Sequence, residues 1–472
     1  MQVQQCEQVL GYVTLRQGGT AASRLKVVTT YDGLPHQCTD AQLTAEQALY
    51  TSFFPQGHGF WNGRMKFAEY MKMRMDDLFG TFSRCSYYIS GMYQVFTSVR
   101  LTLSSTEVVY DRDIARYRRE HESATLEDAI RHVLRHSVPS TIPGSPSWHS
   151  RNYSKLLAMV KEYGHPSFFL TLTVDEKESS ATRFEEVEAL EFIMTSCYGE
   201  GRGSRWTSLP TFCSRLFHHR LWQLMDNHIL GGAEIYGKVL HYFIRYEHQG
   251  RGSLHAHIIL WVDEADAERV GNEIVAAIPG VWDEEAQEYK SPEHFEEHNH
   301  PEVVRYFNLV KNKMQHTCLT DGCLKKNPGR CQYGFPFQPN AEATKFDNNK
   351  DQWVYYRPRQ ADKWTVPHHP VGLCLWGAHS CLEKVSSGEL ARYLLKYATK
   401  CSPTGTINIP RDHVENLGIE IPVDVTSIHA AMYGSRPVPA PESACDMMGM
   451  KIVYFSPGDE ATYISTVPPF KR

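Results

Sequence analysis

Hydrophobic side chains recur at the three- and four-residue spacing of one helix face between residues 66 and 95. The side chains in this stripe are Phe67, Tyr70, Met71, Met75, Leu78 and Phe82. Weaker patterns of the same kind predict helices near residues 153–163, 214–227, 265–278 and 388–400. The chain therefore has helical segments along most of its length.

Strand patterns interrupt these helices. Residues 167–174, SFFLTLTV, are rich in aromatic and β-branched side chains and predict a buried strand. Further along, HYFIRYE (241–247) and SLHAHIILWV (253–262) are separated by five residues that include two glycines, which predicts a β-hairpin. Strands and helices in this order favour an α+β fold with a central antiparallel sheet over a doubly wound fold.

The length of 472 residues exceeds one ordinary domain. Residues 137–147, SVPSTIPGSPS, contain proline and glycine and predict a linker. We therefore expect a mixed and helical N-terminal lobe over residues 1–136, a central domain over residues 148–405 and a C-terminal extension over residues 406–472.

The composition is that of an ordinary globular protein, with 42% hydrophobic and 22% charged residues and a net charge of −5. This charge argues against nonspecific coating of nucleic acid, so any DNA contact must use local basic patches such as residues 311–330 and 384–400. The chain begins without a signal-peptide pattern and has no apolar run long enough to span a bilayer. We expect an intracellular protein without a membrane partner, located in the nucleus if the host is a eukaryote.

The hairpin carries a candidate metal site. His255 and His257 are two residues apart on one strand, so both imidazoles point to the same face. Glu247 lies across the predicted turn, where cross-strand neighbours approach to about 5 Å. Two nitrogens and one oxygen with open positions suit Mg²⁺ or Mn²⁺ and would also accept Zn²⁺. His248 is a competing third ligand on the opposite face, and two histidines that merely line a polar sheet face are the alternative.

A second candidate site is the segment GELARYLLKYATK. Tyr393 and Tyr397 are four residues apart and share one helix face, with Lys396 and Lys400 beside them. A phenol needs such positive charge to act as a nucleophile, because its ordinary pKa is about 10. Without a metal site nearby, the same spacing is typical of a packing stripe.

A third candidate is a cluster of one histidine and three cysteines. His316, Cys318, Cys323 and Cys331 lie within sixteen residues, in a chain whose twelve cysteines are too few for a disulfide scaffold. Three thiols and one imidazole form a tetrahedral zinc set that can fold a segment over residues 311–336. The spacing differs from the commonest zinc fingers, so reduced core cysteines are the alternative.

Five segments in order resemble the nuclease region of Helitron-type Rep proteins. They are FAEYMKMRMDDLFGTFSRCSYYISGMYQVF, LLAMVKEYGHPSFFLTLTVD, RYEHQGRGSLHAHIILWV, QHTCLTDGCLKKNPGRCQYGFP and ARYLLKYATK. The second segment contains the Phe-x-Thr-x-Thr pattern of the family at Phe169, Thr171 and Thr173. The third resembles its His-hydrophobic-His (HUH) motif with the preceding glutamate.

The resemblance implies an HUH endonuclease fold with flanking helices and a zinc-binding insertion. It implies that Glu247, His255 and His257 hold a divalent ion that orients a phosphate of single-stranded DNA at a transposon or replicon end. Tyr393 or Tyr397, with Lys396 beside them, would attack and leave a 5′-phosphotyrosine link. Members of the family usually continue into a helicase, but the chain contains no phosphate-binding Gly-x-x-x-x-Gly-Lys-[Ser/Thr] loop. We therefore expect a helicase that is missing here or is a separate protein.

Two other functions would need different residues. A His-triad nucleotide hydrolase needs a third histidine on the strand, where Ile259 stands. The other alternative is a non-catalytic DNA-binding module with structural zinc, in which the two tyrosines only pack.

Overall fold

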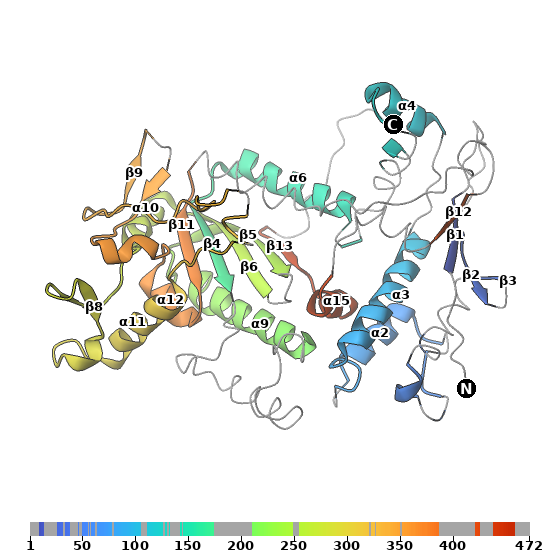
Figure 1. The fold of residues 1–472 in the computed structure, drawn as a ribbon, viewed down its shortest axis with the longest axis horizontal. Helices are drawn as coiled ribbons and strands as arrows, with labels where there is room; N and C mark the ends of the chain where they lie inside the picture. Colours follow the sequence, from blue (N-terminus) through green and yellow to red (C-terminus); the bar gives the residue numbers. More distant parts are fainter. Residues whose placement is uncertain are drawn as a thin grey trace. The chain divides into compact units, whose positions relative to one another are not determined.

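The computed structural model describes several stretches of the chain. They are residues 9–13, 26–31, 34–37, 46, 50–104 except 55, 57, 62–63 and 78–79, 111–173 except 126–127, 130–131, 133–141 and 144, 210–248, 254–386 except 321, 326 and 350–351, 421–424 and 438–457. The chain forms two compact units, drawn in Figure 1. The first contains Met1–Leu157, Thr207–Thr211 and Leu394–Met450, and the second contains Ala158–Trp206, Phe212–Tyr393 and Lys451–Arg472.

The first unit combines a four-stranded antiparallel sheet with helices. Its strand order is β12-β1-β2-β3, from Ile421–Asp424, Val9–Val13, Lys26–Tyr31 and Leu34–Gln37. The helical elements are η1 (Thr51–Phe53), α2 (Phe67–Met75), α3 (Ser86–Ser104), α4 (Asp111–Glu120), the first part of α6 (Pro146–Tyr163) and α15 (Ala440–Met447). Helix α15 packs against α2 and α3, so part of the expected C-terminal extension completes this core.

The helix expected over residues 66–95 is two helices. Between α2 and α3 the chain turns at Gly80, whose φ of +65° is a conformation that favours glycine. The Asp77 carboxylate accepts a hydrogen bond of 2.8 Å from the backbone N–H of Thr81 and stabilises the turn. The apolar spacing continues across the break because Met75 and Phe82 pack into the same core.

A buried carboxylate lies inside this core. The Glu46 side chain is inaccessible to solvent and accepts hydrogen bonds of 2.6 Å from both Tyr70 and Tyr88 and of 3.0 Å from the backbone N–H of Trp61. The Arg74 guanidinium lies 3.6 Å away. Burial is the main reason why the pKa values of the two phenols are raised, and Glu46 adds to that rise. Glu46 therefore links segments that are distant in the sequence.

We predict that Glu46→Gln weakens the first unit, because the amide NH₂ would face a phenolic O–H and leave a buried donor without an acceptor. The expected cost is about 1–3 kcal/mol. Hydrogen exchange of the peptide that contains Trp61 reports the change locally. The matched control is Glu69→Gln, an exposed position in α2. Equal exchange rates in the two variants would contradict the prediction.

The second unit contains a five-stranded antiparallel sheet in the order β11-β4-β6-β5-β13, whose strands lie side by side in Figure 1. These strands are Ser380–Lys384, Phe168–Thr173, Leu254–Val262, Val239–His248 and Val453–Phe455. The expected α+β class, antiparallel sheet and hairpin strands are confirmed. Strand β13 was not expected from the sequence.

One face of this sheet, here called the back face, is covered by helix α9 (Pro210–Leu224). On this face, Tyr246 of β5 contacts the ring of Phe217 and lies 2.8 Å from Nδ1 of His218. Strand alternation places Ala256 and Ile258 on the same face, and both are fully buried. The other face, here called the front face, carries Arg245, Glu247, His255 and His257 of the hairpin.

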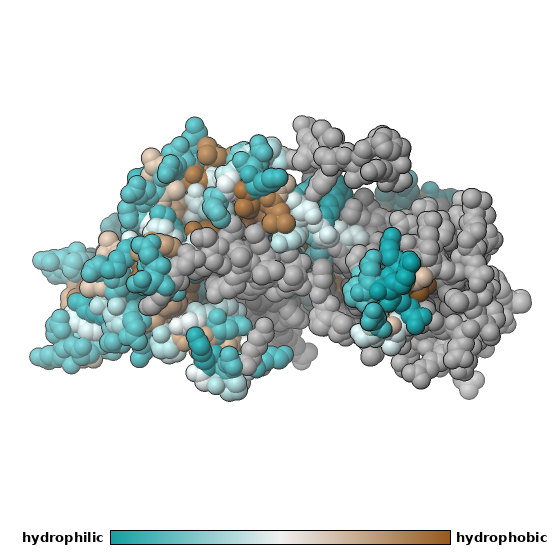
Figure 2. Space-filling model, turned by 90° about the horizontal axis from the view of Figure 1, so that it is seen from above, coloured by the Kyte–Doolittle hydropathy of each residue, from teal (hydrophilic) through white to brown (hydrophobic). Residues whose placement is uncertain are grey.

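Shorter elements complete the second unit. They are η2, a π-helical turn (Met225–Ile229), α10 (Glu264–Glu273), β7 (Val281–Asp283), β8 (Glu288–Lys290), η3 (Pro292–His294), α11 (Pro301–Lys313), β9 (Lys345–Asp347), β10 (Gln352–Val354), η4 (Gln360–Trp364) and α12 (Pro370–Trp376). The described surface seen in Figure 2 is mainly hydrophilic with small hydrophobic patches. Among the described helices, none has the length and apolar character needed to cross a membrane.

Candidate functional site

The register of β5 and β6 fixes the front face. Glu247 is the cross-strand partner of His255, and Arg245 is the partner of His257. Because strand side chains alternate between faces, all four point to the front face. His248 pairs with Leu254 and points to the back face, as the sequence predicted for this competing ligand. The sheet therefore gathers one carboxylate, two imidazoles and one guanidinium on one surface.

His257 has contacts on both of its ring nitrogens. Its Nε2 lies 2.9 Å from Oε2 of Glu247, and its Nδ1 lies 3.2 Å from Oγ1 of Thr171 on β4. The ring of Phe169 stacks on the imidazole with centroids 5.8 Å apart. The His257 residue is 8% exposed. Each side of this imidazole therefore has a defined neighbour.

The separation of Glu247 and His257 fits a shared divalent ion. An octahedral ion with oxygen and nitrogen ligands at about 2.1 Å places adjacent ligand atoms about 3 Å apart. The observed 2.9 Å matches that edge. Oxygen and nitrogen ligands of this kind suit Mg²⁺ or Mn²⁺.

His255 is not part of a group of three converging ligand atoms among the described residues. Among the described residues, one group of three or more ligand atoms lies within 4.8 Å of one another, and it does not include His255. His255 is placed by register alone, opposite Glu247 and beside Thr173. A three-ligand ion site at Glu247, His255 and His257 therefore stays a prediction.

The expected nucleophile segment is not among the described residues. Tyr393, Lys396 and Tyr397 lie outside the parts of the chain that the structure describes. Their roles stay predictions.

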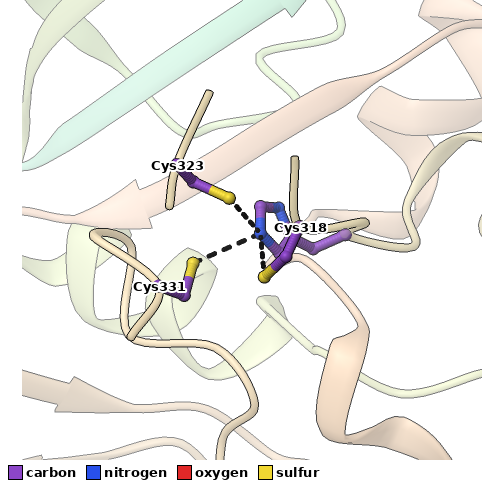
Figure 3. A group of neighbouring side chains, drawn as sticks. Cys318, Cys323 and Cys331 are labelled. Carbon is purple, nitrogen blue, oxygen red and sulfur yellow. Dashed lines mark hydrogen bonds between the residues drawn. The ribbon is translucent and has the colours of Figure 1, made fainter. Parts of the chain in front are cut away.

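The Cys/His cluster is the group that the structure does assemble. Its four members are His316, Cys318, Cys323 and Cys331. The three sulfur atoms lie 3.5, 3.6 and 3.3 Å from Nε2 of the histidine, in sequence order, and Figure 3 shows them converging on that nitrogen. A tetrahedral zinc ion with ordinary Zn–S and Zn–N distances has S···N edges of about 3.5 Å. The group can therefore hold a metal such as zinc.

Backbone hydrogen bonds position the cluster. The N–H of His316 donates to the carbonyl of Trp364 at 2.8 Å, and the N–H of Gln332 donates to the carbonyl of Cys323 at 3.1 Å. The His316 ring also stacks on Phe335 with centroids 4.4 Å apart. These contacts attach a segment with little core of its own to η4.

The thiols of the cluster differ in acidity. Burial and hydrogen bonding with the other two thiols raise the pKa of Cys318 to about 12. Burial also raises the pKa of Cys331, but hydrogen bonds from the backbone N–H groups of Tyr333 and Phe335 outweigh it, and the pKa lies below its usual value. Burial lowers the pKa of His316 and favours the neutral imidazole that a metal needs.

Electrostatic contacts link the cluster to the front face. Burial raises the pKa of the Tyr333 phenol, and the charges of Cys323, Cys331 and Glu247 add to the rise. Burial lowers the pKa of His379 to about 4, and His316 contributes to that shift. The carbonyl of His379 accepts from the N–H of Thr173 at 3.0 Å. The Cys/His segment therefore lies beside the front face.

Comparison with known protein families identifies the first part of this arrangement. Residues 70–260 match the family model described as the Helitron helicase-like domain at the N-terminus. Over these residues the chain is similar to that family, which supports a Helitron-type Rep protein. The match runs from α2 into β6 and includes Glu247, His255 and His257, whereas the Cys/His cluster and the two tyrosines lie beyond it. No curated protein matches the chain.

This match supports a Helitron-related protein that processes DNA. It begins at Tyr70 and ends at Leu260, so it spans helices of the first unit as well as strands of the second. The domain boundaries expected after residues 136 and 405 are not tested by it and stay predictions.

Sequence reasoning did not find the neighbours of His257. Thr171 and Phe169 were noted as part of a family pattern, without a role. The available signal was their spacing, because alternate residues of FFLTLT share one face of a strand. The pairing of β4 with β6, which the sequence does not state, then brings that face to the histidines.

We predict that the purified chain holds about one zinc ion and that Cys331→Ser removes it, because a structural zinc needs all four ligands. Elemental analysis after mild chelation measures the zinc content. The control is Cys374→Ser, which changes a half-buried cysteine outside the cluster and should keep the metal. Zinc retained at full occupancy in the Cys331 variant would contradict the assignment.

We also predict that zinc binds more weakly as the pH falls. The Cys318 thiol is protonated at neutral pH because its pKa is raised to about 12, and zinc binding must release that proton. One released proton changes the dissociation constant about tenfold per pH unit, and further protons steepen the slope. Competition with a chromophoric chelator, corrected for its own protonation, measures this slope. An affinity independent of pH would contradict thiolate ligation.

Proposed function

We propose that the chain is a metal-dependent HUH endonuclease that nicks and joins single-stranded DNA. The observation that carries this proposal is the 2.9 Å pair of Glu247 and His257 on the front face, with His255 in register beside it. This pair lies inside the matched Helitron-type domain. Rolling-circle transposition or replication initiation is the process that such an activity would serve.

The front face supplies groups for holding a phosphate. Glu247, His255 and His257 would hold Mg²⁺ or Mn²⁺, which when bound polarises a phosphoryl oxygen. Arg245 is the register partner of His257 and adds a positive charge on the same face. Phosphoryl transfer depends mainly on such positioning and charge stabilisation.

In the proposed reaction, the phenolic oxygen of Tyr393 or Tyr397 attacks the phosphorus of a DNA phosphodiester. A bond from tyrosine oxygen to phosphorus forms while the bond from phosphorus to the 3′-oxygen breaks. The phenolic proton leaves and the 3′-oxygen ends protonated, which gives a 5′-phosphotyrosine link and a free 3′-OH. Lys396 would stabilise the phenolate.

The second tyrosine would permit a second transfer without hydrolysis, because each step exchanges one phosphodiester for another. Structural zinc at the Cys/His cluster would hold that segment beside the front face. A single-stranded substrate requires strand separation, so a helicase, in the same protein or as a separate partner, belongs to this proposal.

We predict that labelled single-stranded DNA and Mn²⁺ give a covalent adduct on a denaturing gel. The double variant Tyr393→Phe/Tyr397→Phe should lose the adduct, because it lacks both nucleophilic oxygens, while each single variant should lose one cleavage or joining step. The label must be on the 3′ side of the cleavage position, because the 5′-phosphate is the end that becomes attached.

The control variant is Tyr333→Phe. Tyr333 is chosen because the charge of Glu247 acts on its phenol and the residue is 46% exposed, so it is a described tyrosine that could substitute as the nucleophile. Full adduct formation in the Tyr333 variant and none in the double variant is the expected result. The double variant could still form the adduct and lose it only when Tyr333→Phe is added. That result would show that the nucleophile is Tyr333 of the Cys/His segment.

A non-catalytic DNA-binding module is the second candidate. The observation that favours it is that, among the described residues, the Cys/His cluster is the ligand group already assembled. This function predicts DNA binding that needs zinc, forms no adduct with Mn²⁺ and is unchanged in the double tyrosine variant.

A further inference from the structure

The front face of β4 provides neighbours for a histidine that the proposed ion would use. Thr171 is the cross-strand partner of His257 in the pairing of β4 with β6. Its hydroxyl oxygen lies 3.2 Å from Nδ1, while Nε2 of the same ring lies 2.9 Å from the Glu247 carboxylate. The three side chains therefore form one line across three adjacent strands.

The chemistry of imidazole determines which ring nitrogen of His257 carries the proton when an ion binds. A nitrogen that binds a cation uses its lone pair, so the ring proton must be on the other nitrogen. Because Nε2 is the nitrogen that faces Glu247, an ion shared with Glu247 would bind Nε2 and leave the proton on Nδ1. Nδ1–H would then donate to Oγ1 of Thr171.

The ion-free protein requires the opposite arrangement. The 2.9 Å contact then is a hydrogen bond that Nε2–H donates to the carboxylate of Glu247. In the neutral imidazole, Nδ1 then has no proton and accepts a hydrogen bond from the Thr171 hydroxyl. A hydroxyl can donate in one state and accept in the other by rotating its O–H bond, whereas a carbonyl can only accept.

Phe169 supports the same ring from a different direction. It is two residues before Thr171 on β4, and its ring is inclined by 15° to the imidazole plane. This stack limits rotation of the His257 ring about the line that joins its two partners. Phe169 therefore restricts the plane of the imidazole, and the Thr171 hydroxyl can bond to Nδ1 in either proton arrangement.

We propose that Thr171 is a positioning residue for His257, whose hydroxyl holds the imidazole ready to bind a divalent ion through Nε2. This inference rests on the proposed ion site and assigns a role to the alternating Phe169 and Thr171 of the first strand. It involves no contact between Thr171 and DNA or the ion.

The test measures Mn²⁺ binding to the full chain by electron paramagnetic resonance of free Mn²⁺, with the Cys/His cluster loaded with zinc beforehand. Thr171→Val keeps the shape and the β-branch but removes the hydroxyl. We expect it to weaken Mn²⁺ binding about 10- to 100-fold, the usual effect of losing a partner of a metal-bound histidine. Thr171→Ser restores the hydroxyl and should stay within about threefold of the wild type.

Thr173→Val is the matched control. Thr173 lies on the same strand and face, and among the described residues its hydrogen bonds are made by backbone atoms, to His379 and Trp376. We expect it to bind Mn²⁺ within about threefold of the wild type. Thermal unfolding of each variant distinguishes a loss of ion binding from a loss of folding. If valine disturbs the strand, Thr171→Ser still tests whether the hydroxyl is sufficient for Mn²⁺ binding.

The outcomes are distinguishable. Wild-type binding that Glu247→Gln abolishes, with Thr171→Val weakened and Thr171→Ser restored, supports the inference. Equal affinity of the wild type and Thr171→Val, or equal weakening by Thr171→Val and Thr173→Val, overturns it while leaving the proposed function intact. Absence of any Mn²⁺ binding that depends on Glu247 in the wild type overturns both the ion site and this inference.

Discussion

The register between β5 and β6 is the constraint on which the rest of the front face depends. Ala256 and Ile258 are fully buried on the back face, so a shift of the strand by one residue would replace these apolar side chains in that core. Such a shift would also move His255 and His257 from the front face to the back face. Hydrophobic burial therefore fixes the position of polar groups that contribute little to the core themselves.

Two kinds of ligand group lie beside each other in the second unit, and their chemistry differs. The Cys/His cluster supplies three thiols and one nitrogen, which satisfy a tetrahedral ion and leave no position for a substrate. Glu247 and His257 supply one oxygen and one nitrogen, which leave most positions of a divalent ion open. The first arrangement suits folding and the second suits chemistry on a phosphate.

Local pattern was enough to predict the strands and the faces on which their residues lie. The hairpin, the strand that contains Thr171 and the grouping of four cluster residues all follow from short spacings. Contacts between distant segments were not predictable, because the pattern in one segment does not indicate which other strand or helix it packs against. The break at Gly80 was missed since Met75 and Phe82 pack into one core on both sides of it, and β13 was missed because three residues carry too little pattern.

Asp362 shows how such distant contacts determine where the cluster lies. This fully buried carboxylate accepts hydrogen bonds from the backbone N–H of Ile278 and the hydroxyl of Tyr289, both at 2.9 Å. It thereby holds η4, whose Trp364 carbonyl accepts the N–H of His316. The position of the cluster therefore depends in part on a carboxylate that lies outside the segment of its four ligands. Spacing among the ligands predicts that a metal can bind, whereas the place of that metal in the fold depends on a residue that binds none.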